Sequence, residues 1–304
     1  MPRTAAGWPK RRAPPHRAVK ALHNAGLPSK PILVFFSVRE PLGRETPLVV
    51  EIPHAGLFVD AETLATLVAP ARAIGLDADL YVDELYARAP ELGATVLVAH
   101  TSRYVCDLNR AESDYDGLAV QGGTTRSAPH GLVWRTTTEN QPSLSAPLGQ
   151  RELERRMELV YRPYHRTLAS ILEGKRARFG YAVLLCAHSM PSLGRLGHTD
   201  AGRERADVVP GSRGRTTAAA PVIEAPDRLA REFGWTVSHD DPYRGGHSTV
   251  HYGRPALQVH AVQVELARRL YMDERTLEKK QNDFNKVESF CDALVARLGD
   301  LALG

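Results

Sequence analysis

Short apolar runs alternate with amphipathic segments along most of this chain, and this alternation constrains the fold more than any other feature. The runs with the length and branched side chains of buried strands are residues 32–36, 48–52, 95–99, 181–187 and 257–266. The segments with apolar residues at helical spacing are residues 60–68, 79–92, 151–178, 225–233 and 273–298. Because strand–helix alternation is typical of α/β proteins, we predict a single domain with a central mixed, mostly parallel sheet flanked by helices.

Two polar segments interrupt this alternation. Residues 114–147 are rich in Gly, Thr, Ser and Pro, which predicts a long excursion over the surface. Residues 193–220 combine glycines with many charges, so we expect an active-site loop there rather than a linker. Within the helical segments, Pro163 predicts a kink and Asp273 predicts a helix N-cap.

The excess of positive charge lies at the start of the chain. The formal net charge is +4, and residues 1–30 hold seven basic residues and no acid, so 4 − 7 leaves −3 for residues 31–304. We predict that residues 1–30 form a disordered, Pro-rich basic extension and that residues 31–304 form the domain. Since Trp8 is the single aromatic residue of the extension, a stacking platform for nucleic acid is not expected.

The cysteines and the hydropathy pattern indicate the compartment. Cys106, Cys186 and Cys291 are far apart and form no CxxC motif, which argues against a disulfide framework and against a zinc finger. No apolar run approaches the ~18 residues of a membrane helix, and the first residues lack the apolar core of a secretory signal. The sequence therefore predicts a reducing, cytoplasmic setting and no membrane partner.

Two histidines directly follow apolar runs, at the edge where open α/β sheets bind ligands. They are His54, in the sequence PHAG, and His188, in AHSM. A catalytic zinc takes three protein ligands from His, Asp or Glu and leaves one position for water. A carboxylate near the start of the second helical segment would complete such a set, and the candidates are Asp79, Asp83 and Glu84. The same acids would also stabilise a helix N-terminus without binding any ligand.

Glu265 ends the last apolar run, where a buried charge is costly unless it is paired or takes part in chemistry. Beside a zinc-bound water this carboxylate would act as general base and then pass its proton to the leaving amine. The alternative is a glutamate on an edge strand in solvent. No GxGxxG, GxxxxGK(S/T), GxSxG or HExxH motif is present, so the chemistries that these motifs serve find no support.

Basic and amide side chains after the third apolar run suit an acidic substrate. Arg103 and Arg110 can bind carboxylates bidentately, and Asn109 can add amide hydrogen bonds. Arg110 could instead pair with Asp107 and fasten the loop. A further polar loop carries Arg244 beside two glycines, which allow a close approach of the backbone.

Several of these motifs resemble the N-formylglutamate amidohydrolase family. The matching segments, in the order of the family, are PHAG around His54, DADLYVDELY at 77–86, SRYVCDLNR at 102–110, AHSMPS at 187–192 and the block 243–274, which contains QVELAR. The resemblance extends from about residue 47 to residue 298. It implies a fold similar to that of the zinc carboxypeptidases and aminoacylases, in which a mixed sheet holds a metal at its strand ends.

The resemblance also implies an activity and a set of site residues. Members hydrolyse a small acidic N-acyl amino acid, in the type case N-formyl-L-glutamate to glutamate and formate in histidine breakdown. One zinc ion per chain, or another divalent metal, would be held by His54, Asp79 and His188, with Asp79 preferred to Asp83. Glu265 matches the glutamate that acts as general base, which makes 31–304 a catalytic domain. The expected substrate-binding residues are Arg103, Asn109, Arg110 and Arg244.

Some residues depart from the family pattern. Cys186 stands where members often have an acid, two residues before the second histidine, so we expect a partner of His188 to be lost or replaced. Leu80 stands where members have Trp, and segment 194–220 is longer and more basic. These departures concern substrate choice more than metal chemistry. The alternatives are an amidohydrolase for a different N-acyl substrate and a non-catalytic sensor of an acidic metabolite. The sequence leaves open whether the protein is a monomer or a dimer.

Overall fold

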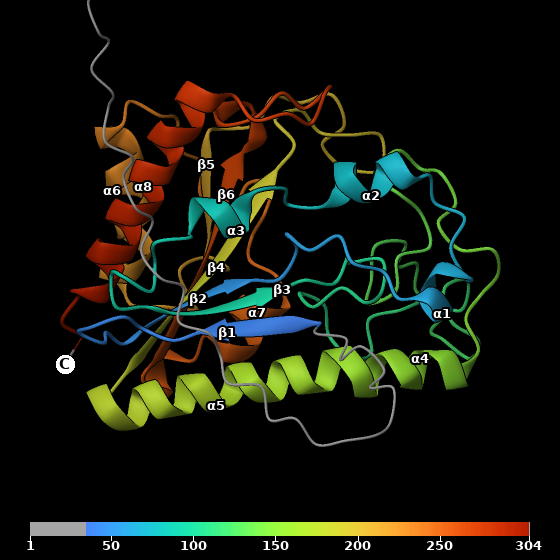
Figure 1. The fold of residues 1–304 in the computed structure, drawn as a ribbon, viewed down its shortest axis with the longest axis horizontal. Coiled ribbons are helices and arrows are strands. Elements are labelled where there is room, and N and C mark those ends of the chain that lie inside the picture. The colour runs from blue at the N-terminus through green and yellow to red at the C-terminus, as the bar shows by residue number, and fades with distance from the viewer. Residues whose placement is uncertain (1–34, 304) are drawn as a thin grey trace, which may run out of the picture. The chain divides into compact units, whose positions relative to one another are not determined.

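A mixed six-stranded sheet runs through the described part of the chain, residues 35–303 of a computed structural model (Figure 1). The strands are β1 (Phe36–Arg39), β2 (Leu48–Ile52), β3 (Thr95–Ala99), β4 (Ala182–Met190), β5 (Val208–Gly211) and β6 (Val259–Ala267). Their order in the sheet is β1-β3-β2-β4-β6-β5, with parallel pairing among the inner strands and antiparallel pairing of β1 and β5 at the edges. The predicted single α/β domain with a mixed, mostly parallel sheet is confirmed. The predicted extension, residues 1–30, lies outside the described residues.

Strand pairing extends the sheet beyond two of the apolar runs. β2 and β3 have the predicted bounds, whereas β4 and β6 continue to Met190 and Ala267. These two strands pair in parallel over their whole length, and the register places His188 opposite Glu265. His188 therefore lies within a strand and not after it, because a backbone ladder continues beneath polar side chains that find hydrogen-bond partners.

Within residues 35–303 the helices are more numerous than the sequence predicts, and most are shorter, although α6 begins five residues before the predicted segment 225–233. They are α1 (Ala61–Leu64), α2 (Ala71–Asp77), α3 (Val82–Leu85), α4 (Gln150–Arg156), α5 (Arg162–Phe179), α6 (Ala220–Glu232), α7 (His247–Tyr252) and α8 (Gln281–Gly299). The predicted helix 79–92 is reduced to α3, because the left-handed backbone of Tyr81 (φ 68°) prevents an earlier start. The predicted N-cap at Asp273 is wrong: its carboxylate accepts two backbone N–H groups of a turn, and α8 begins at Gln281.

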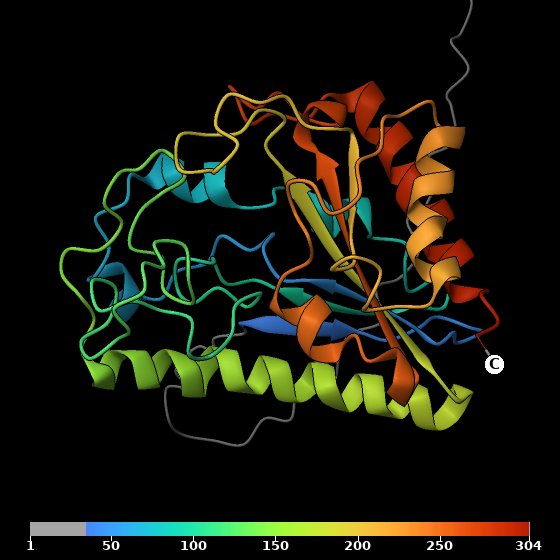
Figure 2. The ribbon, with the colours of Figure 1, turned by 180° about the vertical axis from the view of Figure 1, so that it is seen from behind.

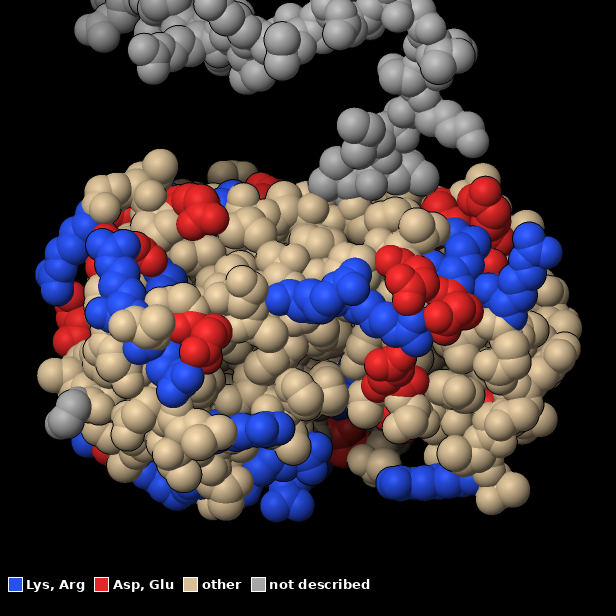
Figure 3. Space-filling model, turned by 90° about the horizontal axis from the view of Figure 1, so that it is seen from below, with Lys and Arg blue, Asp and Glu red and all other residues tan. Residues whose placement is uncertain are grey.

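A nearly continuous helix covers one side of the molecule. α4 and α5 lie in line in Figures 1 and 2 and are joined by a π-helical turn, Met157–Tyr161. Pro163 lies in the first turn of α5, where its missing N–H costs little stability. At the position of the expected kink the structure has the wider π-helical turn, which ends just before α5. Figure 3 views this side and shows basic and acidic side chains interspersed, in keeping with the ion pairs Arg162–Glu158 and Arg176–Glu173.

Both faces of the sheet are buried. α3, α6 and α8 pack on one face against side chains such as Val50 and Val183, and α4 and α5 pack on the other against Val49 and Leu184 (Figures 1 and 2). Consecutive residues of a strand face opposite sides, so inner strands covered on both faces are apolar throughout. Segment 114–147 holds no helix or strand, as predicted, and its loops gather beside α1 and α4. The expectation of a surface excursion is only partly met, because Val120, Leu132 and Val133 are fully buried in the core. Among residues 35–303, no helix has the length and apolar character that crossing a bilayer requires.

Candidate active site

The residues selected from the sequence all line one cavity of ≈ 340 Å³ where β2, β4 and β6 end. They are His54, Asp79, Arg103, Asn109, Arg110, His188, Arg244 and Glu265. His54 follows β2, while His188 and Glu265 lie near the ends of β4 and β6. Parallel strands bring their carboxyl ends to the same edge, which is why residues so far apart in sequence meet.

His54, Asp79, His188 and Glu265 form the buried part of the cavity, here called the inner group, and each is at most 5% exposed. Nδ1 of His54 and Nδ1 of His188 are 3.2 Å apart, and Oδ2 of Asp79 lies 3.0 Å from the latter and 3.6 Å from the former. Ligand atoms around a tetrahedral zinc with bonds of ~2.0 Å are about 3.3 Å apart. The two imidazoles and the carboxylate therefore fit a tetrahedral divalent metal.

Asp79 is the acid that faces the histidines, whereas Asp83 and Glu84 lie in α3 and do not line the cavity. The N–H of Asp79 donates to the carbonyl of His54 (2.9 Å), and Nη2 of Arg268 donates to Oδ1 (3.1 Å). Burial would raise the pKa of Asp79, but its hydrogen bonds to the two histidines hold this pKa well below its usual range. The carboxyl group is therefore an anion placed to bind a cation.

Glycines let the loops approach the cavity. A Cβ at Gly56, in the motif PHAG, would lie 2.2 Å from the carbonyl carbon of His100. A Cβ at Gly246 would lie 2.3 Å from Nδ2 of Asn109. Gly56 therefore lets the turn after β2 pack against the backbone at His100, and Gly246 leaves room for the side chain of Asn109 before α7.

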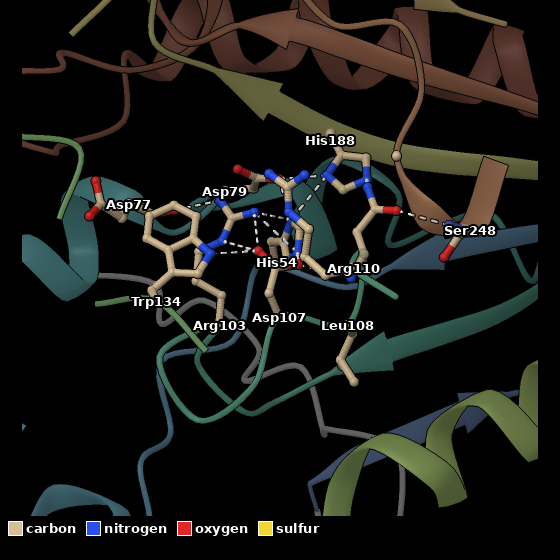
Figure 4. Close-up of polar contacts among 12 residues, drawn as sticks. His54, Asp77, Asp79, Arg103, Asp107, Leu108, Arg110, Trp134, His188 and Ser248 are labelled. Carbon is tan, nitrogen blue, oxygen red and sulfur yellow. Dashed lines mark hydrogen bonds and ion pairs between the residues drawn. The ribbon is translucent and has the colours of Figure 1, made fainter. Parts of the chain in front are cut away.

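Asp107 contacts the ring nitrogen of His54 that points away from Asp79 and His188. Its Oδ1 lies 2.7 Å from Nε2 of His54, and its Oδ2 accepts from Nη2 of Arg103 and Nε1 of Trp134, each at 3.0 Å (Figure 4). Burial would raise the pKa of Asp107, but the charges of His54 and Arg103 hold this pKa well below its usual range. A carboxylate behind a ligating histidine fixes the orientation and tautomer of the ring. The alternative pair of Asp107 with Arg110 does not form, because Arg103 takes that place.

Glu265 faces His188 across the β4–β6 ladder. Its Oε1 accepts a hydrogen bond from Nε2 of Gln263 (2.8 Å), and its Oε2 has no hydrogen-bond partner within residues 35–303. Burial raises the pKa of Glu265, since desolvation outweighs the attraction of the charge on His188. A carboxylate with a raised pKa on a cavity wall is suited to accept a proton.

Asn109 contacts the other ring nitrogen of His188. Its Nδ2 lies 3.1 Å from Nε2 of His188 and donates to Oε1 of Gln263 (3.2 Å), while its Oδ1 accepts the N–H of Ser248 (3.0 Å). Cys186 pairs with Glu51 of β2 in the sheet, and its Sγ accepts a hydrogen bond from Oγ1 of Thr249 (3.6 Å) and makes none with His188. The replacement partner expected from the presence of Cys186 is therefore Asn109.

The arginines expected to bind substrate differ in their contacts. Arg103 donates to Asp107 and to the carbonyl of Asp77 (3.0 Å), so protein groups already occupy much of its guanidinium. Arg110 and Arg244 line the same cavity, and neither side chain has a hydrogen-bond partner among the described residues. These two guanidinium groups are available to an anion.

The sequence does not identify several residues that line the cavity, Asp107, Arg213 and Arg268 among them. It offers Asp107 only as a partner of Arg110, and Arg268 shows no signal except its place three residues after Glu265. Arg213 also lines the cavity. It falls in the segment predicted to be an active-site loop, so the loop was found and the residue was not.

The class that fold and cavity define is an α/β protein with a candidate metal centre beside a buried glutamate, at the carboxyl edge of a mixed sheet. The profile of the N-formylglutamate amidohydrolase family matches residues 46–272 of the chain. The chain belongs to this family and is an amidohydrolase.

Two relatives are N-formylglutamate deformylases. The one from Pseudomonas putida is 38% identical over 232 residues, which are 75% of this chain and 82% of the relative. The one from Pseudomonas aeruginosa is 37% identical over 231 residues, which are 75% of this chain and 83% of the relative. The crystal structure of N-formylglutamate amidohydrolase from Ralstonia eutropha matches with a TM-score of 0.81 and 32% identity, covering 88% of this chain and 98% of that chain. A gene product from Agrobacterium tumefaciens, with a TM-score of 0.61 and 16% identity over 86% of this chain and 94% of its own, shares the fold.

Proposed function

We propose that this protein hydrolyses N-formyl-L-glutamate to glutamate and formate with the help of one zinc ion or another divalent metal. The observation that carries the proposal is the convergence of two histidines and Asp79 at tetrahedral spacing, beside Glu265. The two N-formylglutamate deformylases similar to this chain support the substrate. A place in histidine breakdown in the cytoplasm is part of the same proposal.

The metal would be held by Nδ1 of His54, Oδ2 of Asp79 and Nδ1 of His188. Buried imidazoles and one carboxylate are a ligand set that zinc takes in catalytic sites. When bound, zinc polarises the scissile carbonyl and acidifies water. Asp107 keeps the ring of His54 in place, and Arg268 does the same for the carboxylate of Asp79.

Glu265 is the proposed general base. Its Oε1 accepts a hydrogen bond from Gln263, so its Oε2 is the oxygen left to accept the proton of the attacking water. The same carboxyl then donates this proton to the nitrogen of the leaving amine, which departs as a neutral amino group. The raised pKa of Glu265 suits both steps, because the acid form must persist long enough to protonate the leaving group.

Arg110 and Arg244 are proposed to bind carboxylates of the substrate, since both guanidinium groups lie on the cavity and lack a protein partner among residues 35–303. Arg103 and Asn109 also line the cavity. Arg103 donates a hydrogen bond to Asp107, and Asn109 contacts Nε2 of His188. Both residues therefore position the inner group, and any contact with the substrate would be a second role.

The proposal is tested by a hydrolysis screen of the zinc-supplemented protein against N-formyl-, N-acetyl- and N-succinyl-L-glutamate. We expect N-formylglutamate to be cleaved fastest. Cleavage of another acyl amide with N-formylglutamate untouched would contradict the substrate. Binding of N-formylglutamate without turnover of any compound would contradict hydrolysis and support a sensor.

A further inference from the structure

Three arginines at the cavity lack an acidic partner. They are here called the outer arginines: Arg110, Arg213 and Arg244. None of them forms an ion pair with a carboxylate of residues 35–303. By contrast, Arg103 and Arg268, which line the same cavity, are paired with Asp107 and Asp79. The cavity therefore carries positive charge that its own acids do not neutralise.

Arg213 lies in a loop after β5 that is held in an unfavourable conformation. Arg213, Gly214 and Arg215 are consecutive left-handed residues, with φ of 51°, 72° and 65°. The carboxylate of Asp240 accepts the N–H groups of Ser212 (2.7 Å), Arg213 (3.1 Å) and Gly214 (2.6 Å). Left-handed residues other than glycine persist where the surrounding structure holds them, and such positions gather at ligand sites. The backbone that carries Arg213 is thus arranged before any ligand binds.

The same loop is joined to the loop that carries Arg244. The N–H of Arg213 donates to the carbonyl of Arg244 (2.9 Å), and Nε of Arg213 donates to the carbonyl of Gly245 (3.0 Å). The terminal nitrogens of Arg213 make no hydrogen bond within the described residues. Two guanidinium groups on two joined loops can together bind one carboxylate through several charge-assisted hydrogen bonds.

Arg110 differs from the other two outer arginines in its burial and in its place in the chain. It directly follows Asn109, which contacts His188, and it is partly buried, whereas Arg213 and Arg244 are exposed. In an N-acyl glutamate the α-carboxylate is attached to the carbon that bears the reacting amide nitrogen. Two methylene groups separate the side-chain carboxylate from that carbon. With the amide at the inner group, the α-carboxylate must stay near it, and the side-chain carboxylate extends toward the exposed arginines.

We propose that Arg213, together with Arg244, binds the side-chain carboxylate of the substrate and so selects N-acyl derivatives of dicarboxylic amino acids. Arg110 takes the α-carboxylate. This inference rests on the proposed function and assigns specificity to a residue of the segment 194–220, which the sequence singled out as long and basic.

The test compares Arg213→Gln with a matched control, Arg215→Gln. Arg215 has the same left-handed backbone two residues further along, but its guanidinium pairs with Glu224 (2.8 Å) and does not line the cavity. Each variant is assayed with N-formylglutamate and with N-formylglutamine, which has nearly the same shape and no side-chain charge. We expect the ratio of kcat/KM for the charged over the neutral substrate to fall about 10- to 100-fold in Arg213→Gln, mainly through KM. Arg215→Gln keeps the wild-type ratio, and Arg213→Lys retains part of it.

An unchanged ratio in Arg213→Gln, or an equal fall in Arg215→Gln, would overturn the assignment. A parallel loss on both substrates would also overturn it, because a contact with the α-carboxylate or a general effect on the loop would lower both rates alike. If the wild-type protein hydrolyses neither compound, the proposed function fails instead. In that event calorimetry decides the inference: N-formylglutamate must bind more weakly to Arg213→Gln than to Arg215→Gln, and equal binding would overturn it.

Discussion

The inner group and the outer arginines line one cavity, yet they are built in opposite ways. The inner group comes mainly from strands and strand ends, is almost fully buried, and is hydrogen-bonded to buried partners such as Asp107, Arg268 and Gln263. The outer arginines come from loops and have no acidic partner among residues 35–303. The side chains proposed to perform the chemistry are thus held by hydrogen bonds before a ligand binds, whereas the arginines proposed to select the ligand have no carboxylate to neutralise their charge.

This difference predicts different kinetic effects. A change in the inner group should remove stabilisation of the transition state and lower kcat, whereas a change in the outer arginines should weaken binding and raise KM.

Glu265→Gln should have the largest effect. We expect kcat for N-formylglutamate to fall by about 10²- to 10⁴-fold, because the amide cannot accept the proton of water, while KM changes little. Steady-state kinetics with zinc in excess measures both constants. A variant with near wild-type kcat would show that Glu265 is not the base.

Asp107→Asn should weaken metal binding by about 10- to 100-fold, because the ring of His54 loses the carboxylate that orients it. Competition with a chelator measures the affinity. The matched control is Asp116→Asn, which removes a buried carboxylate paired with Arg135 (2.9 Å) outside the cavity. Equal losses in both variants would mean that the effect is one of folding rather than of orientation.

Arg244→Gln should raise KM for N-formylglutamate about tenfold and change kcat by less than about threefold, since its guanidinium contacts no protein group that the chemistry needs. Arg228→Gln is a suitable control, because Arg228 pairs with Glu224 on the outside of α6. If Arg244→Gln lowered kcat and left KM unchanged, the division between the two parts of the cavity would not hold.

The smallest effect concerns two histidines outside both parts of the cavity, His165 in α5 and His247 at the start of α7. The rings of His165 and His247 are 5.4 Å apart, and burial lowers the pKa of His165 to about 3 and that of His247 to about 4. Histidines of an unfolded chain take up protons below about pH 6.5, whereas these two stay neutral in the folded chain down to about pH 4. The unfolded state therefore binds more protons in this window, and the free energy of unfolding decreases as pH falls.

His165→Gln should remove part of this acid sensitivity. The contribution of His165 to the loss of stability between pH 7 and pH 5 is about 2 kcal/mol. Denaturant unfolding at the two pH values measures it, with the exposed His100→Gln as control. An identical pH dependence in wild type and His165→Gln would contradict the assignment to His165.

Most of the inner group can be predicted from the sequence, because the ends of strands can be recognised as the ends of apolar runs. His54, His188 and Glu265 each stand at the end of an apolar run, and parallel strands bring such ends together. Asp79 is different, since acids at the start of a helix look the same with or without a ligand. Its choice over Asp83 depends on the family resemblance. In the structure Asp79 precedes the left-handed Tyr81 and lines the cavity, whereas Asp83 lies in α3 and does not.

What the sequence could not show depends on contacts between distant segments. Asp107 is four residues from Arg103 and three from Arg110, so local spacing allows either pair, and the contact with Trp134 from a remote loop helps to decide it. Likewise, the conformation of the loop around Arg213 is set by Asp240, which follows it by 27 residues. The local conformational preferences of a segment do not reveal which distant residues will contact it.

We propose that His54, Asp79 and His188 hold a metal on which turnover depends, with Glu265 acting beside it. The decisive experiment measures metal content and turnover of N-formylglutamate together on wild type, Glu265→Gln and His188→Ala. We predict about one zinc per chain in wild type and in Glu265→Gln, with turnover in wild type alone, and neither metal nor turnover in His188→Ala. Full metal content and full turnover in folded His188→Ala would contradict the account.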